Sequence, residues 1–217
     1  MPSKTRPPKP KKSYHHGDLR RTLLEASVAL LDEHGVDALS LREVARRADV
    51  SSAAPYHHFA SKAELLGAIA AEGFRALAQA MRDATAGLDE DEDPIARFSA
   101  LGNAYVAFAR TRTSEFRLMF RGGGARSQAL PADCRPDEAF SLLVEALEQV
   151  ARVLPHELQE TGALVVTAWS VVHGAAELVL EGPLAHEGGT LAMTPDRVGP
   201  TAVATLETML RVASATR

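Results

Sequence analysis

The sequence contains very little cysteine, since Cys134 is the only one among 217 residues. The chain therefore cannot form an internal disulfide or a thiolate zinc cluster. Such cysteine usage is typical of a reducing cytoplasm, where we expect this protein to be located. Residues 1–13 are basic and rich in proline, and they lack the apolar segment of a secretory signal peptide.

Lysine is absent after position 62. Residues 1–62 contain 11 Lys and Arg against 7 Asp and Glu, a net charge of +4, whereas residues 63–217 contain 13 against 21, a net charge of −8. This asymmetry predicts that the first part of the chain meets a polyanion such as nucleic acid. A solubilising tail is the alternative for the basic residues of 1–13, which we expect to form a disordered arm.

Motifs of catalysis and of metal binding are missing as well. The sequence contains no GxSxG, no HExxH and no paired-carboxylate spacing, so we expect no enzyme activity. The glycine-rich stretch RGGGARSQALP (121–131) lacks the spacing of a phosphate-binding loop. The acidic run LDEDEDP (88–94) predicts a solvated loop, with a metal-binding cluster as the alternative. We therefore predict neither a cofactor nor a metal site.

Strand-like alternation is absent, and nearly every periodic segment has helical spacing, which predicts an all-α fold of about nine helices. Leu19, Leu23, Ala26 and Leu30 mark the first helix, which we expect to end at Gly35. The predicted helices cover about 18–34, 40–48, 52–58, 61–85, 95–111, 114–120, 136–153, 156–181 and 196–214.

The longest apolar run is ALVVTAWSVVHGAAELVL (163–180). It includes His173 and Glu177, and both side chains are costly inside a bilayer. We therefore expect a buried helix of a soluble protein, covered on more than one side, and no membrane span.

Residues 40–62 have the pattern of a helix-turn-helix. Ser40 and Glu43 form a capping box at the start of a short helix, Asp49 and Val50 follow as a turn, and a second short helix comes next. The residues that can share a small core are Leu41, Val44, Ala45, Val50 and Phe59. In such a motif the second helix enters the major groove of DNA. The pattern predicts a three-helix DNA-binding domain at 14–62, followed by a helical domain at 63–217.

The second short helix carries the residues that we expect at DNA. Pro55 falls in its first turn, where the missing N–H costs little and where the ring adds an apolar face toward the groove. Tyr56 and His57 point away from the helix and can reach phosphate oxygens. Lys62 lies at the N-terminus of the next helix, which favours anions. Metal binding by His57 and His58 is the alternative, but helical neighbours point about 100° apart and share a metal poorly.

The stretch YHHGDLRRTLLEASVALLDEHGVDALSLREVARRADVSSAAPYHHFASKAELL (14–66) resembles the DNA-binding domain of the tetracycline-repressor (TetR) family of bacterial transcriptional regulators. The resemblance rests on the spacing of the helix-ending glycine, the LREVA segment, the VS pair at 50–51 and the tyrosine, phenylalanine and lysine that follow. It implies a recognition helix at 52–58. The implied phosphate contacts are Ser40, Tyr56 and Lys62, and the implied base contacts are Ser52, Ala53 and His57.

Arg42, Ser51 and Pro55 complete the predicted DNA-binding set. Pro55 departs from the branched apolar residue that is common in the family at its position. Few side chains of this set can make bidentate contacts with bases. Much of the specificity is therefore expected from contacts with thymine methyl groups and from DNA shape.

The resemblance implies that residues 63–217 serve dimerisation and effector binding. Helix 156–181 is rich in small residues that allow close approach, and helix 196–214 carries a stripe of Ala202, Leu206, Met209 and Ala213. We expect a homodimer through these two helices as a four-helix interface. A twofold dimer suits a palindromic operator in double-stranded DNA, because its two half-sites lie about 34–36 Å apart. The alternative is that both helices complete a monomeric core.

Larger side chains of the second domain mark a candidate ligand site. They are Tyr105, Phe108, Phe116, Met119, Phe120, Trp169 and His173. Together they are expected to enclose a small apolar effector with a few polar groups, with plain core packing as the alternative. Trp169, His173 and Gly174 resemble the Trp-His-Gly (WHG) signature of one C-terminal subgroup of the family. His173 is either a ligand-sensing donor or a core histidine.

These features predict a sequence-specific transcriptional regulator, a repressor released by a small-molecule ligand. A ligand in the second domain would shift the long helix that begins near Ser61 and so change the spacing of the two half-sites. The alternative function is an effector-independent dimeric DNA-binding protein, in which residues 63–217 are a dimerisation scaffold.

Overall fold

The structure is a computed structural model that describes residues 16–88, 93–120, 130–134, 136–181 and 193–216. These residues form eight α-helices and two short 3₁₀ helices, and no strand occurs among them, so the all-α prediction is confirmed. The chain divides into two compact units, Met1–Leu65 and Leu66–Arg217. The division that we predicted falls three residues earlier, and the predicted basic arm at 1–13 lies outside the described residues.

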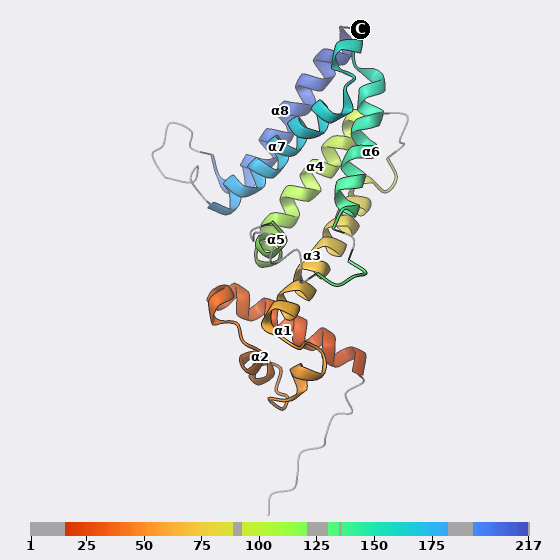
Figure 1. Ribbon diagram of the computed structural model, residues 1–217. Helices are drawn as coiled ribbons and strands as arrows, with labels where there is room; N and C mark the ends of the chain where they lie inside the picture. The colour runs from red at the N-terminus through yellow and green to blue at the C-terminus, as the bar shows by residue number, and fades with distance from the viewer. Residues whose placement is uncertain (1–15, 89–92, 121–129, 135, 182–192, 217) are drawn as a thin grey trace, which may run out of the picture. The chain divides into compact units, whose positions relative to one another are not determined.

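The first unit contains α1 (His16–Ala38), α2 (Leu41–Arg47) and the 3₁₀ helix η1 (Ala54–His57) (Figure 1). Leu23, Val44 and Phe59 are at most 2% exposed and form the centre of its core. Gly35 interrupts α1 with φ 74° and ψ 179°, as the sequence predicts. This backbone conformation is accessible to glycine and strained for residues with a Cβ atom.

A serine caps the start of both α2 and the helix that begins at Lys62, and the capping box predicted at Ser40 forms only in part. The Glu43 N–H donates to Ser40 Oγ over 3.2 Å and begins α2, while the Glu43 carboxylate accepts from Arg46 instead of returning to the cap. At the start of α3 (Lys62–Thr85) the Glu64 N–H donates to Ser61 Oγ over 3.2 Å. There the Glu64 carboxylate accepts from the Ala60 N–H over 2.6 Å, so the second motif is the more complete one.

The predicted second short helix at 52–58 is wrong in length and type, because only a four-residue 3₁₀ helix is present. Its hydrogen bonds run from Tyr56 N–H to Ala53 O and from His58 N–H to Pro55 O, a spacing of three residues. Pro55 has no N–H to donate, and its ring disfavours the α conformation of the preceding residue. The proline therefore disfavours an α-helix that begins before it, at residues 52–54.

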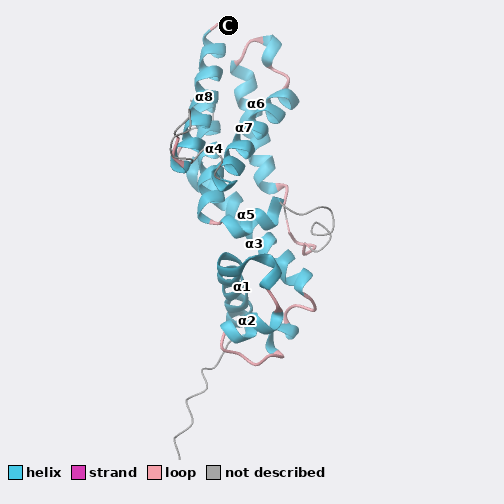
Figure 2. Ribbon diagram, turned by 90° about the vertical axis from the view of Figure 1, so that its left-hand side faces the viewer, coloured by secondary structure: helices cyan, strands magenta, loops and turns pink. Residues whose placement is uncertain are grey.

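The second unit consists of the remainder of α3 and six further helical segments. They are α4 (Pro94–Thr111), α5 (Thr113–Phe120), α6 (Glu138–Val153), η3 (His156–Leu158), α7 (Thr161–Glu181) and α8 (Pro195–Ala215). Helices α4, α6, α7 and α8 lie side by side in both views (Figures 1 and 2). The single helix predicted at 156–181 is split, because Glu160 begins α7 by accepting from the Gly162 and Ala163 N–H groups.

Helix α4 lies in the middle of this unit and approaches α8 closely. A Cβ atom added to Gly199 would lie 2.2 Å from Val106 Cγ1, so only glycine allows this approach. Asp93 joins α4 and α8 at the other end of this helix pair. It caps α4 by accepting from the Ala96 N–H, and it accepts from Arg211 Nη2 of α8, over 2.9 Å each. These contacts, the backbone one first, lower the pKa of the Asp93 carboxyl.

Helix α7 is covered on one side and exposed on the other. Ala168, Val172 and Ala176 are buried against α4, α6 and α8, whereas Val166 is 67% and Leu178 is 40% exposed. The expectation of burial on more than one side is therefore wrong within this chain. By length and composition alone α7 is long and apolar enough to cross a membrane, a property that core helices of soluble proteins share.

Replacing Gly35 with alanine is expected to lower the free energy of unfolding by about 1–3 kcal/mol, because a Cβ atom strains this backbone conformation. Chemical denaturation followed by circular dichroism measures the change. Asp37→Ala is the matched control, an exposed position two residues along with an expected change within about 0.5 kcal/mol. Equal stability of both variants would show that the backbone conformation at position 35 is not strained for alanine.

Candidate DNA-binding surface and ligand site

The predicted DNA-binding residues lie on α2, on the turn that follows it, on η1 and at the start of α3. Seven of the nine are exposed, namely Ser40, Arg42, Ser51, Ser52, Ala53, Tyr56 and His57. Lys62 is half-buried and is the first residue of α3, as predicted. Helices α2 and η1 pack against each other, so these side chains come from one compact part of the first unit.

Pro55 is the exception, because it is buried. Its ring packs inside the first unit and cannot add an apolar face toward a DNA groove, so this prediction is corrected. The predicted core position of Phe59 is confirmed, since only 2% of it is exposed. The guanidinium of Arg20 lies 5.4 Å from the centre of the Phe59 ring, a cation–π contact that the sequence pattern did not indicate.

The basic side chains around α2 differ in how far they are already paired. Arg47 donates to both carboxylate oxygens of Glu33 over 2.6 Å, and Arg46 pairs with Glu43. These hydrogen bonds lower the pKa of the Glu33 and Glu43 carboxyls. Arg42 forms no ion pair within the described part of the chain, so its charge is available to a phosphate group.

Lys62 has a defined position before any ligand binds. Its Nζ donates to the backbone carbonyl of Asp37 over 3.3 Å. Asp37 lies two residues beyond Gly35, so the break in α1 shapes the segment that holds this lysine. The remaining ammonium hydrogens can still be donated to an anion, because one ammonium group has three donors.

Five of the seven predicted ligand-site residues form one cluster of rings from α4, α5 and α7: Tyr105, Phe116, Phe120, Trp169 and His173. The Trp169 and His173 rings are stacked with centres 5.2 Å apart and planes 9° apart. Tyr105 is only 4% exposed and Phe116 is fully buried. The cluster is therefore packed ring against ring, and the five residues line neither of the two cavities described below.

A polar pair lies inside this cluster. Tyr105 Oη and His173 Nδ1 are 2.7 Å apart, and the phenol O–H can donate to Nδ1 when the imidazole proton is on Nε2. Burial, followed by the charge of Glu177, raises the pKa of Tyr105. Burial lowers the pKa of His173, and Glu177 opposes this change. Both groups are therefore neutral near pH 7, and a ligand would meet a donor and an acceptor without charge.

The other two predicted ligand residues lie outside the ring cluster. Met119 is partly buried in the core, and its Sδ atom would lie 2.6 Å from a Cβ atom added to Gly73 on α3. Phe108 lies under the Arg112 guanidinium, which is 5.9 Å from its ring centre. Their roles in ligand binding remain predictions, as do those of the clustered residues.

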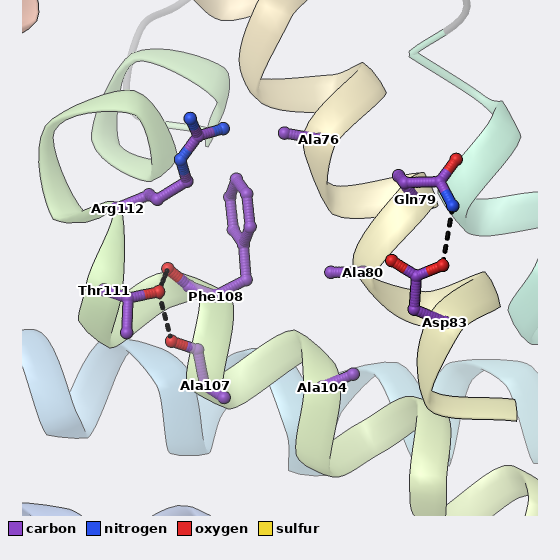
Figure 3. A pocket seen from close by; sticks show the side chains of 9 residues that line it. All are labelled: Ala76, Gln79, Ala80, Asp83, Ala104, Ala107, Phe108, Thr111 and Arg112. Carbon is purple, nitrogen blue, oxygen red and sulfur yellow. Dashed lines mark hydrogen bonds between the residues drawn. The ribbon is translucent and has the colours of Figure 1, made fainter.

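Phe108 lines an open cavity of about 500 Å³ between α3 and α4 (Figure 3). The lining consists of alanines with polar groups around them: Ala76, Gln79, Ala80, Asp83, Ala104, Ala107, Phe108, Thr111 and Arg112. Gln79 Nε2 donates to Asp83 Oδ1 over 2.7 Å on the α3 side. This cavity was not predicted from the sequence, because alanine spacing alone does not distinguish an open groove from close helix packing.

Comparison with known proteins decides the family. Residues 23–69 match the model of bacterial regulatory proteins of the tetR family, and residues 98–206 match the model of the tetracyclin repressor-like C-terminal domain. The chain belongs to the TetR family. It is a DNA-binding transcriptional regulator of the helix-turn-helix type. Membership of the Trp-His-Gly subgroup remains a prediction.

Individual relatives share sequence or fold with this TetR-family chain. An uncharacterized HTH-type transcriptional regulator from Haemophilus influenzae is 34% identical over 111 residues, which are 51% of this chain and about half of that relative (53%). A structure of a protein of unknown function from Rhodococcus sp. RHA1 is 31% identical, with a TM-score of 0.65 over 94% of this chain and 100% of that one. AibR, in complex with isovaleryl coenzyme A and operator DNA, has the same fold at 19% identity, with a TM-score of 0.60 over 86% and 97% of the two chains.

NMR titration of the His173 Cε1 proton is expected to give a midpoint below the ordinary pKa of 6.5, because burial favours the neutral imidazole. The stability that His173 contributes is then complete above pH 6.5 and decreases as the pH falls below it. Glu177→Gln should lower the midpoint further, since the Glu177 charge raises it. Glu181→Gln, one turn along α7, should change it less. A midpoint at or above 6.5 in the unaltered protein would contradict the buried Tyr105–His173 pair.

Proposed function

We propose that this TetR-family regulator is a cytoplasmic homodimeric repressor that a small-molecule ligand releases from a palindromic operator. The observation that carries the proposal is the exposed apolar face of α7 in the second unit, combined with a helix-turn-helix in the first. A symmetric homodimer formed through that face would present two helix-turn-helix domains to the two half-sites of one operator. We propose no catalytic activity, because the family consists of transcriptional regulators.

DNA contact in this proposal is divided between phosphate and base edges. Arg42 and Lys62 supply charge to phosphates, and Tyr56, which is 52% exposed, supplies a hydroxyl group. Ser52 and Ala53 precede η1, and His57 ends it, so these three residues are proposed to face the bases. The short η1 offers few donors for bidentate contacts, which leaves a large share of specificity to DNA shape.

The proposed dimer interface consists of the exposed sides of α7 and α8, which pack against each other. Along α7 the exposed side carries Val166, Ser170 and Leu178, and along α8 it carries Thr208 and Val212. Val212 is 62% exposed and adds to the apolar side chains on this side of the two helices. Two such pairs of helices from two chains would bury these apolar side chains in a four-helix interface.

The proposed effector site is the ring cluster around Tyr105 and His173. The AibR complex, whose fold this chain shares, holds a coenzyme A thioester together with operator DNA, which supports a ligand-responsive role for this fold. A small apolar effector would have to displace rings that are closely packed. Helix α3 begins in the first unit and continues into the second. There it lies beside α5, since Gly73 of α3 faces Met119 of α5. A change in the packing of the ring cluster can therefore act on α3. A coupling of about 1–3 kcal/mol would change operator affinity about five- to 150-fold.

The packing of the same cluster favours a second candidate function. Phe116 is fully buried and Tyr105 nearly so, which is what a ligand-free dimerisation scaffold also requires. In that case the protein is an effector-independent dimeric DNA-binding protein. Operator affinity that no cell extract or small-molecule library changes would favour this alternative.

Selection of bound sites from random duplex DNA provides the operator for a direct test. Lys62→Ala should then weaken binding to the selected site and to unrelated DNA alike, and should reduce the slope of log affinity against log salt concentration by about 0.9. Tyr56→Phe should also weaken binding without changing base preference. Fluorescence anisotropy at several salt concentrations measures both effects.

Arg75→Ala is the matched control for these variants, because Arg75 lies on the second-unit part of α3 and pairs with Glu72. Its salt dependence should equal that of the unaltered protein. A change of base preference in either Lys62→Ala or Tyr56→Phe would contradict the proposed phosphate contacts. If the unaltered protein selects no DNA sequence from the random duplexes, the proposed operator binding is contradicted.

A further inference from the structure

A second cavity lies where α6 ends and α7 begins, beside the C-terminal part of α8. Its volume is about 320 Å³, which is at the lower end of the range for small-molecule sites. The deep wall consists of Phe98, Leu147 and Leu154, each at most 1% exposed. No residue of the ring cluster contributes to it, so this cavity is separate from the proposed effector site.

The mouth of the cavity combines exposed apolar side chains with carboxylates. Leu158 is 47% and Met209 is 63% exposed, although both line the cavity. Exposed side chains of this size around a cavity are typical of a surface that binds something apolar. The apolar wall therefore predicts an occupant with an apolar body of a few carbon atoms in length.

The charge at the mouth has one sign. Glu157 and Glu160 line the cavity, and no lysine or arginine is among the described residues that line it. Glu160 is engaged with the Gly162 and Ala163 N–H groups at the start of α7, while the exposed Glu157 forms no hydrogen bond or ion pair within the described ranges. Glu157 is therefore the group that is free to meet a ligand, and a positive charge is its complement.

We propose that this cavity binds an organic cation with an apolar body, of the chemical class of primary alkylamines. The alkyl chain lies among Leu154, Leu164 and Leu210, and the ammonium group lies at the Glu157 carboxylate. A carboxylate ligand of the same length would bring a like charge to Glu157 and Glu160. The proposal is independent of the regulatory function above, because its test is binding to this cavity and not release of DNA.

A series of straight-chain ligands tests the proposal by isothermal titration calorimetry on the full chain. From n-butylamine to n-octylamine, the affinity should rise about fourfold for each added methylene group until the cavity is filled. Octylamine should bind about tenfold more tightly than octanoate, because one exposed charge pair contributes up to about fivefold and the acid adds repulsion. Octanol should lie between the two.

Matched variants locate the binding. Glu157→Gln should weaken octylamine binding about threefold and leave octanol binding unchanged, whereas Glu145→Gln, on the exposed side of α6, should change neither. Ala213→Leu places additional carbon atoms inside the cavity and should abolish binding of the whole series. Ala215→Leu, on the same helix but outside the cavity, should leave binding intact.

Three results would overturn the proposal. Octanoate that binds as tightly as octylamine would contradict the role of the carboxylates, as would a Glu157→Gln variant with unchanged octylamine affinity. Met209 also borders the proposed dimer face, so a side chain of a second copy is the competing occupant. If no ligand of the series binds at millimolar concentration and Ala213→Leu weakens the dimer, the cavity belongs to the dimer interface.

Discussion

Helix α7 carries more apolar side chains than α4, α6 and α8 of the same chain cover, and the organisation of the second unit follows from this imbalance. Its buried side, with Ala168 and Ala176, allows the close packing that places α4 in the middle of the unit. Its flank contributes Trp169 and His173 to the ring cluster. Its exposed side carries Val166 and Leu178, which the proposed homodimer would cover. One helix thus connects core, candidate ligand site and proposed interface.

The first unit depends on a different constraint, which is backbone geometry. Gly35 with φ 74° ends the regular part of α1, and the segment after it brings the Asp37 carbonyl to the Lys62 ammonium group. Pro55 lies in the first turn of the four-residue η1 and is buried, so in the proposed complex it shapes this element without contacting DNA. The surface that remains offers a few short polar side chains and two available charges. Such a surface favours phosphate contacts and shape over direct base readout.

Helical spacing and caps made much of the fold predictable from the sequence. The bounds of α3, α4, α5 and α8 follow from apolar periodicity, and Ser40 and Ser61 mark helix starts that the structure confirms. The errors arose where one residue acts through several partners. Pro55 was expected to face DNA, but its ring is buried in the first unit. The single helix expected at 156–181 is split, because the Glu160 carboxylate begins α7. Apolar periodicity indicates neither the burial of one side chain nor a cap inside an apolar run. The two cavities were not predictable, because they depend on how helices distant in sequence diverge.

Sedimentation equilibrium is the most direct measurement of the central claim, which is that a second copy covers α7. The account predicts a mass of twice 23.2 kDa at micromolar concentration for the unaltered chain. Val166→Asp should give the monomer mass, since it places a charge in the proposed interface, whereas Leu88→Asp, at an exposed leucine outside α7 and α8, should keep the dimer. A mass of 23.2 kDa for the unaltered chain, at concentrations at which it binds its selected DNA site, would contradict the account.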